Sequence, residues 1–243
     1  QNKQITLKDI WIDYAFYPKG MTNLSALKNT NQYTVLNYDY TNLNYTIDLY
    51  NFSTLEKEKT LFDTKKFPQI KRINSYTFNK QEDKILIATN KEPIFRRSFS
   101  ADFYVFDLKK QELAKLTDKK IQEPLFSPQG DKVAYVYKNN IYIYDTQSKK
   151  EQQVTFDGEK NKIINGTSDW VYEEEFSIVR TFDWNADGTQ LAYIRFDEHE
   201  VPEFSMDIYG TTLYPTKDTF KYPKAGEKNS VVSLYLYDVK AGK

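Results

Sequence analysis

The sequence of 243 residues contains no cysteine and only one histidine, His199. Without cysteine the chain forms neither a disulfide nor a thiolate metal site, and a single histidine excludes a metal centre built from several imidazoles. We therefore expect no metal and no cofactor. His199 lies between acidic residues in FDEHEVPEF, where an exposed loop histidine is a better explanation than a catalytic base.

Glycine is also scarce, and the catalytic motifs that depend on it are missing. None of the eight glycines lies in a G-x-S-x-G nucleophile elbow, and there is no glycine-rich phosphate loop. This stretch of chain therefore carries no recognisable catalytic group of its own. Lys+Arg and Asp+Glu both number 34, which gives no basic surface for nucleic acid. The apolar runs are far shorter than the ~20 residues of a membrane-spanning helix.

Aromatic residues, in contrast, are abundant: 20 Tyr, 16 Phe and 3 Trp. Such residues suit the half-buried surface of a β-sheet. A sequence unit recurs among them, since FSPQGDKVAYV (126–136) aligns without a gap with WNADGTQLAYI (184–194). A weaker copy, FNKQEDKILIA (78–88), has Glu82 where the other two have glycine. Each unit predicts a tight turn followed by a strand.

A second unit follows the first and predicts a β-hairpin, because residues alternate with a period of two on either side of a turn. Its copies are residues 47–62, 103–117, 141–155 and a truncated 233–243. The two units together give about four strands per repeat, which is typical of a β-propeller blade. A β-sandwich is the alternative, but it gives no reason for the turn unit to recur.

We therefore predict an all-β fold, a β-propeller of four-stranded antiparallel blades with a short helical insertion and a projecting arm. The last repeat stops at Lys243 in mid-pattern. We expect residues 1–243 to be a partial N-terminal propeller domain, about the first four blades of a larger ring.

Two segments interrupt the repeat. Residues 166–184, GTSDWVYEEEFSIVRTFDW, contain Ser168 and Asp169, either of which can cap the start of a helix. Residues 200–230 contain three prolines, which are confined to the edges of sheets, and this predicts a projecting hairpin. Functional residues more often lie on loops of a rigid scaffold than on its strands.

The three consecutive glutamates of the first segment allow two interpretations. They could form a solvated helix face, which is the common role of such a run. Alternatively, Glu174 and Glu175 point about 100° apart on a helix, so their side chains could converge on one cation.

The string GTSDWVYEEEFS resembles the double-glutamate motif of the dipeptidyl peptidase IV family, within the prolyl oligopeptidase clan. The similarity continues through WNADGTQLAYIRFDEHEVPEF to YPKAGEKNS and upstream to RRSFSADFYVFDL. It covers most of the chain from about Ile70, whereas the first 60 or so residues match only loosely. The resemblance implies a propeller followed by an α/β-hydrolase domain with catalytic Ser, Asp and His. That domain is absent from residues 1–243, so no catalytic residue is expected in this chain.

The resemblance also implies particular roles for residues. Glu174 and Glu175, the second and third glutamates of the triplet, would bind the N-terminal ammonium of a peptide. Arg96 is the best match for an arginine that would bind near the peptide's backbone carbonyl, and the adjacent Arg97 is the alternative. The arm, residues 200–230, matches an element that contributes to a homodimer contact in the family.

The resemblance implies that the full-length protein is a serine exopeptidase that releases Xaa-Pro or Xaa-Ala dipeptides from peptides with a free N-terminus. We expect a periplasmic, secreted or cell-surface protein. The alternative is a non-enzymatic propeller that binds protein partners, because FSPQGDKVAYV also resembles the repeats of TolB-like propellers. A generic propeller blade has no use for DWVYEEE, which favours the peptidase.

Overall fold

A computed structural model describes residues 4–18 and 23–243 of the chain. The chain divides into two compact units, Gln1–Pro68 and Gln69–Lys243. Strands dominate both units, and the predicted all-β class is confirmed.

The first unit contains one antiparallel sheet with the strand order β1-β2-β3-β4. Its elements are α1 (Leu7–Trp11), β1 (Leu24–Ala26), β2 (Gln32–Asp39), β3 (Asn44–Asn51), β4 (Lys57–Asp63) and the short 3-10 helix η1 (Thr64–Lys66). Strands β3 and β4 are the hairpin predicted over residues 47–62. Helix α1 begins at a capping box, in which the Asp9 N–H donates to Thr6 Oγ1 and the Thr6 N–H donates to Asp9 Oδ2.

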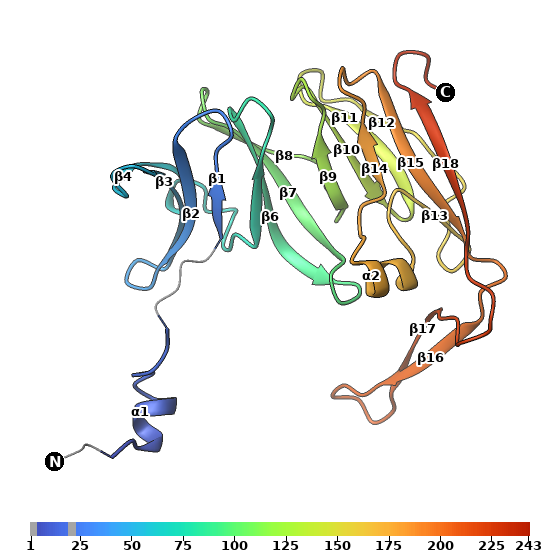
Figure 1. Ribbon diagram of the computed structural model, residues 1–243, viewed down its shortest axis with the longest axis horizontal. Helices are drawn as coiled ribbons and strands as arrows, with labels where there is room; N and C mark the ends of the chain where they lie inside the picture. Colours follow the sequence, from blue (N-terminus) through green and yellow to red (C-terminus); the bar gives the residue numbers. More distant parts are fainter. Residues whose placement is uncertain (1–3, 19–22) are drawn as a thin grey trace. The chain divides into compact units, whose positions relative to one another are not determined.

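The second unit contains three further four-stranded antiparallel sheets. The first is β5 (Ser75–Phe78), β6 (Lys84–Pro93), β7 (Phe99–Asp107) and β8 (Glu112–Lys115). The second is β9 (Gln122–Phe126), β10 (Lys132–Tyr137), β11 (Asn140–Asp145) and β12 (Glu151–Gln153). The third is β13 (Ile163–Asn165), β14 (Phe182–Trp184), β15 (Gln190–Asp197) and β18 (Val231–Asp238). Figure 1 shows these sheets side by side, as adjacent blades of a partial propeller.

The recurring turn unit has the same backbone conformation in all three sheets. Gly130 and Gly188 have φ angles of 71° and 67°, and Glu82 adopts 56° at the equivalent position. Gln81 Nε2 donates to the carbonyl of Pro128, and its equivalent Gln129 Nε2 donates to the carbonyl of Asp187. Each turn is therefore hydrogen-bonded to the turn of the next sheet.

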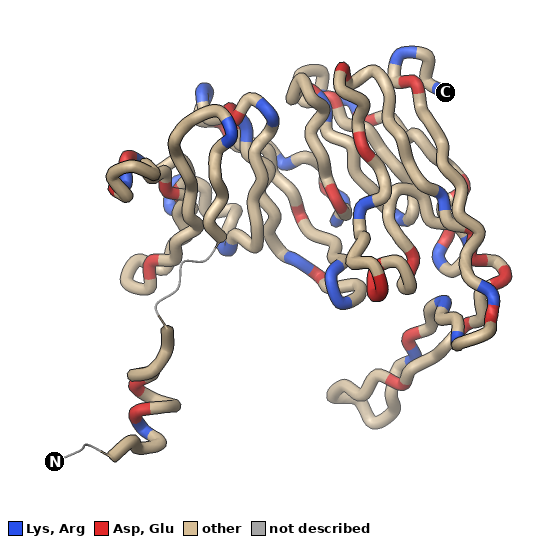
Figure 2. Tube along the Cα trace, viewed as in Figure 1, with Lys and Arg blue, Asp and Glu red and all other residues tan. Residues whose placement is uncertain are grey.

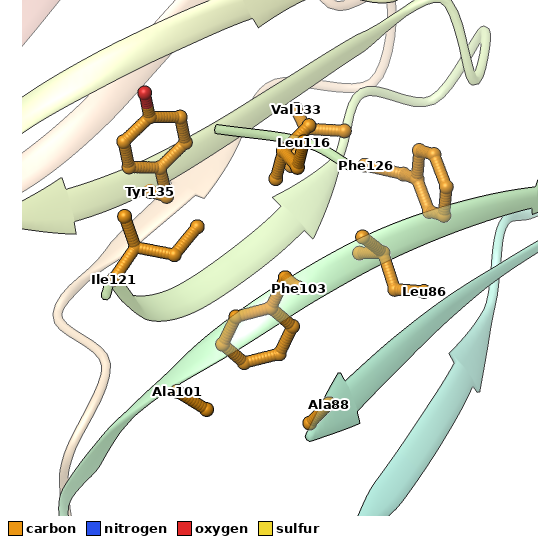
Figure 3. Packing of buried hydrophobic residues seen from close by; sticks show 9 residues of the cluster. All are labelled: Leu86, Ala88, Ala101, Phe103, Leu116, Ile121, Phe126, Val133 and Tyr135. Carbon is orange, nitrogen blue, oxygen red and sulfur yellow. The ribbon is translucent and has the colours of Figure 1, made fainter. Parts of the chain in front are cut away.

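The core of the second unit lies between neighbouring sheets. Leu86, Ala88 and Phe103 of the first sheet pack against Val133 and Tyr135 of the second (Figure 3). A second cluster joins the second and third sheets and includes Val136, Ile141, Phe182, Trp184 and Leu191. Alternate residues of the central strands supply these clusters, as the period-two pattern requires.

The helical insertion interrupts one edge of the third sheet. Strands β13 and β14 pair with different halves of β15, while β18 pairs along its other edge. Between β13 and β14 the chain leaves the sheet through a short paired neck, in which the Ser168 N–H donates to the Val179 carbonyl and the Thr181 N–H to the Gly166 carbonyl. Helix α2 (Trp170–Phe176) lies beyond this neck.

The second interruption is the predicted hairpin arm. Strands β16 (Glu203–Ile208) and β17 (Thr216–Lys221) pair only with each other. In Figure 1 the arm projects beyond the sheets at the same end as α2. An aromatic contact joins the two, with Trp170 and Tyr222 ring centroids 4.4 Å apart.

The neck depends on Gly166, which has a φ angle of 82°. A Cβ atom there would lie 2.7 Å from Ile141 Cγ1, so we expect Gly166→Ala to lower the free energy of unfolding by at least about 2 kcal/mol. Gly210→Ala is the control, because a Cβ atom at 210 would meet nothing within 4 Å. Chemical denaturation of both variants is the measurement, and equal stabilities would contradict this role of the neck.

Candidate functional site

Helix α2 places the glutamate triplet, and its two ends are fixed by specific contacts. Asp169, one of the two candidates for the cap, is the N-cap, and its Oδ1 accepts a hydrogen bond of 2.9 Å from the Tyr172 N–H. The other oxygen, Oδ2, accepts from the Ser230 hydroxyl at 2.5 Å. Ser177 ends the helix in the left-handed conformation with a φ angle of 59°. A helix of seven residues is too short to be stable alone, so these contacts and its packing hold it.

Glu173, the first glutamate of the triplet, is only 2% exposed. Its Oε1 accepts hydrogen bonds from two consecutive backbone N–H groups, those of Arg97 at 2.7 Å and Ser98 at 2.8 Å. The Arg97 guanidinium donates to the backbone carbonyl of Glu173 at 3.3 Å. Glu173 therefore joins α2 to the loop between β6 and β7, 75 residues earlier in the chain.

Glu174 and Arg96, both predicted as substrate-binding residues, form an ion pair in this structure. Arg96 Nη2 lies 2.9 Å from Glu174 Oε1. The Arg96 side chain is 69% exposed and that of Glu174 is 24% exposed, so water is close to the pair. Figure 2 shows the blue β6–β7 loop beside the red of α2. An ion pair of this kind contributes little to folding, typically up to about 1 kcal/mol, and is readily exchanged for another partner.

Glu175, the third predicted residue, is exposed. Within residues 4–18 and 23–243, no hydrogen bond or ion pair involves its side chain. The triplet thus contains one buried carboxylate with backbone partners, one partly exposed carboxylate paired with Arg96, and one exposed carboxylate without a partner in the described residues. Glu174 and Glu175 lie outside the buried face of the helix, and Glu174 faces the Arg96 guanidinium.

The structure gives Glu173 and Arg97 roles that the sequence did not predict. Glu173 follows Trp170 by three residues, so the two lie on the same face of the helix. This spacing was the signal in the sequence that Glu173 could be buried. Arg97 contacts the backbone of Glu173, whereas its neighbour Arg96 contacts the Glu174 carboxylate. His199 remains outside this site: its side chain is 55% exposed and its Nδ1 lies 2.6 Å from Asp197 Oδ1.

A second carboxyl group, Glu123, lies close enough to α2 to sense its charge. Burial raises the pKa of Glu123, and the negative charge of Glu173 adds to this rise. Arg180 opposes it, with Nη1 3.7 Å from Glu123 Oε2. Glu123 is therefore affected by the opposite charges of Glu173 and Arg180.

A cavity of about 650 Å³ lies behind α2, on the face that carries Trp170 and Glu173. The arm supplies Phe220 and Lys221 to its wall, and the β6–β7 loop supplies Phe95. Glu174 and Glu175 do not line it. The helix thus has a glutamate pair on one side and a separate cavity on the other.

The described residues show neither a metal-binding cluster nor a helix that could span a membrane. Across 4–18 and 23–243, no group of three or more His, Asp or Glu side chains is arranged to hold a metal ion. Within the same ranges, none of the helices has the length and apolar character needed to cross a bilayer.

Comparison with known proteins places these features in a family. The family model described as "Dipeptidyl peptidase IV (DPP IV) N-terminal region" matches residues 79–243. Human prolyl endopeptidase FAP is 34% identical over 197 residues, which are 79% of this chain and 25% of that protein. Dipeptidyl peptidase 4 of Felis catus is 37% identical over 171 residues, 68% of this chain and 22% of that protein.

A solved structure agrees with these relatives. The crystal structure of Porphyromonas gingivalis dipeptidyl peptidase 4 matches all of this chain with a TM-score of 0.88 and 38% identity, over 34% of that chain. The chain therefore belongs to the dipeptidyl peptidase IV family, of which it is part of the N-terminal propeller region. It spans about a quarter of the length of the curated relatives it matches.

The role of Glu173 can be tested by its removal. Glu173→Ala leaves the buried Ser98 N–H and the partly buried Arg97 N–H without this acceptor, so we expect a loss of about 2–4 kcal/mol in the free energy of unfolding. Glu175→Ala removes a carboxylate of the same helix that is exposed, and its expected change is within about 0.5 kcal/mol. Urea denaturation of the two variants measures the difference, and a Glu173→Ala variant as stable as the control would contradict the assignment.

Proposed function

We propose that this chain is the substrate-recognition part of a serine-type dipeptidyl aminopeptidase that releases Xaa-Pro or Xaa-Ala dipeptides. Membership of the dipeptidyl peptidase IV family supports this activity for the full-length protein. The catalytic Ser, Asp and His would lie in an α/β-hydrolase domain outside residues 1–243. The propeller would supply the groups that select a free peptide N-terminus.

The observation that carries the proposal is the state of the two glutamates on α2. Glu174 has one exchangeable partner, Arg96, and Glu175 has none in the described part of the chain. Two carboxylates with spare acceptor capacity suit an ammonium group, which has three N–H donors. At about 4 Å and an effective dielectric constant of about 20, each opposite charge contributes about 4 kcal/mol before desolvation is subtracted.

Arg96 completes the arrangement in the proposed complex. When the peptide ammonium pairs with Glu174, the Arg96 guanidinium is released from its present partner and its N–H groups become available to a peptide carbonyl. The peptide is then held at its charged end and at its first backbone carbonyl.

Such a clamp measures distance from the chain end, which an exopeptidase that removes two residues requires. A peptide α-amino group has a pKa of about 7.7–8.0, so it is largely charged at neutral pH. An acetylated N-terminus has no charge, and binding it would desolvate both carboxylates without compensation. Peptides with a free amine are therefore the proposed substrates.

The assembly and location of the protein follow the same family proposal. The arm, residues 200–230, would contribute to a homodimer, and its tip offers exposed apolar side chains, including Tyr209, Leu213 and Tyr214. We propose a periplasmic, secreted or cell-surface location, where extracellular peptides are available.

The clamp is tested with the protein at its natural full length, with Gly-Pro-anilide and its N-acetylated form as substrates. We expect rapid cleavage of the free amine alone. The Glu174→Gln/Glu175→Gln variant should lose about 10²–10³-fold in kcat/KM, which corresponds to about 3–4 kcal/mol of lost stabilisation.

Glu112→Gln, on an exposed position of β8, is the control and should retain wild-type kinetics. Equal cleavage of both substrates would contradict the ammonium clamp. No cleavage by the full-length protein would contradict the peptidase activity and favour a propeller that binds protein partners.

A further inference from the structure

The cavity behind α2 contains a buried carboxyl group that has no ion-pair partner in the described part of the chain. Glu198, at the end of β15, lines the cavity and is 5% exposed. Its backbone N–H donates to the Lys162 carbonyl at 2.7 Å. Within residues 4–18 and 23–243, however, the side chain has neither a hydrogen bond nor an ion pair. Buried carboxyl groups without a partner are rare because their desolvation is unfavourable.

The charged groups around Glu198 do not satisfy it. Burial is the main cause that raises its pKa to about 7, and the negative charges of Asp169 and Asp197 add to the effect. Lys221 acts in the opposite direction, but its Nζ donates to the Val201 carbonyl at 2.8 Å and lies 3.8 Å from Glu203. The carboxyl group therefore has capacity for a further cation.

The other walls of the cavity combine apolar and aromatic side chains with charged ones of both signs, Lys138, Glu159, Lys160, Glu173, Asp218 and Lys221. The aromatic walls carry the argument for an organic ligand. They include Trp170 of α2, Phe220 of the arm and Phe95 of the β6–β7 loop. Phe95 and Phe220 are in ring contact, with centroids 5.9 Å apart, although they come from different segments. Aromatic faces attract cations and also pack against apolar groups. A volume of about 650 Å³ is in the range of sites for small organic ligands.

We propose that this cavity binds a small organic cation, an ammonium or amidinium group carried on an aromatic or alkyl body. The charged group pairs with Glu198, and the apolar body lies against Trp170 and Phe220. This site is distinct from the proposed substrate clamp, because Glu174 and Glu175 do not line the cavity. The proposal does not depend on the peptidase activity.

The test compares benzamidine, an aromatic cation, with benzamide, its neutral analogue of nearly the same shape. We expect isothermal titration calorimetry on the full-length protein at pH 8 to show benzamidine binding at least about tenfold more tightly than benzamide. Glu198→Gln should remove this preference and leave benzamide binding unchanged. Glu174→Gln/Glu175→Gln should change benzamidine affinity less than about twofold.

The pH dependence gives a second readout. Benzamidine remains charged between pH 6 and pH 8, whereas the Glu198 carboxyl group ionises over this range. We expect benzamidine affinity to rise roughly tenfold from pH 6 to pH 8 in the wild type and to stay constant in Glu198→Gln. Asp169, Asp197 and Lys221, the charged groups that act on Glu198, are unchanged in this variant. The other charged side chains that line the cavity are also unchanged: Lys138, Glu159, Lys160, Glu173 and Asp218.

Equal affinity for benzamidine and benzamide would overturn the proposal. So would a loss of benzamidine binding in the Glu174→Gln/Glu175→Gln variant with full retention in Glu198→Gln, since that result locates the cation at the substrate clamp. A crystal structure of the wild-type protein with benzamidine is a further test, and it does not depend on whether any variant folds. It supports the proposal if the amidinium contacts the Glu198 carboxylate, and it overturns the proposal if the cavity contains no benzamidine.

Discussion

The buried carboxylate of Glu173 is the interaction on which the candidate site depends. By accepting the backbone N–H groups of Arg97 and Ser98, it fixes a seven-residue helix to a loop from a different blade. The same contact determines where the neighbouring side chains lie. Arg96 precedes Arg97 in the loop, and Glu174 follows Glu173 in the helix. The two hydrogen bonds of Glu173 therefore set the geometry of the ion pair between Arg96 and Glu174. Without this contact, α2 would not hold the carboxylates of Glu174 and Glu175 at a defined distance from the β6–β7 loop.

The blades supply the rigidity that this contact requires. Cores between neighbouring sheets and the glutamine links between successive turns hold the strands, so the loops at their ends have fixed positions. The helix leaves the third sheet of the second unit through a paired neck, and Ser230, beyond the arm, binds its cap residue Asp169. The α2 segment and the arm segment, which both interrupt the repeat, are thus in contact and stabilise each other. One face of the helix presents exposed glutamates, and the other closes a cavity with the arm.

The sequence predicted most of the fold because its signals are local. Turn units, period-two strands and the cap at Asp169 each depend on residues close in the chain, and the hairpins 47–62, 103–117 and 141–155 form as expected. The different roles of the three glutamates, with Glu173 buried and Glu174 and Glu175 accessible, were not predictable from local signals. The partners of Glu173 are 75 and 76 residues away, and the cavity around Glu198 is built from segments that meet only in the fold. The substrate-binding roles of Glu174, Glu175 and Arg96 came from a family resemblance and stay predictions.

The most direct test of this account is a crystal structure of the full-length protein with the dipeptide Gly-Pro bound. The account predicts that the peptide ammonium lies within about 3 Å of carboxylate oxygens of both Glu174 and Glu175. Glu173 should keep its bonds to the N–H groups of Arg97 and Ser98. An ammonium bound away from both glutamates, or a Glu173 carboxylate that leaves its backbone partners to bind the peptide, would contradict it.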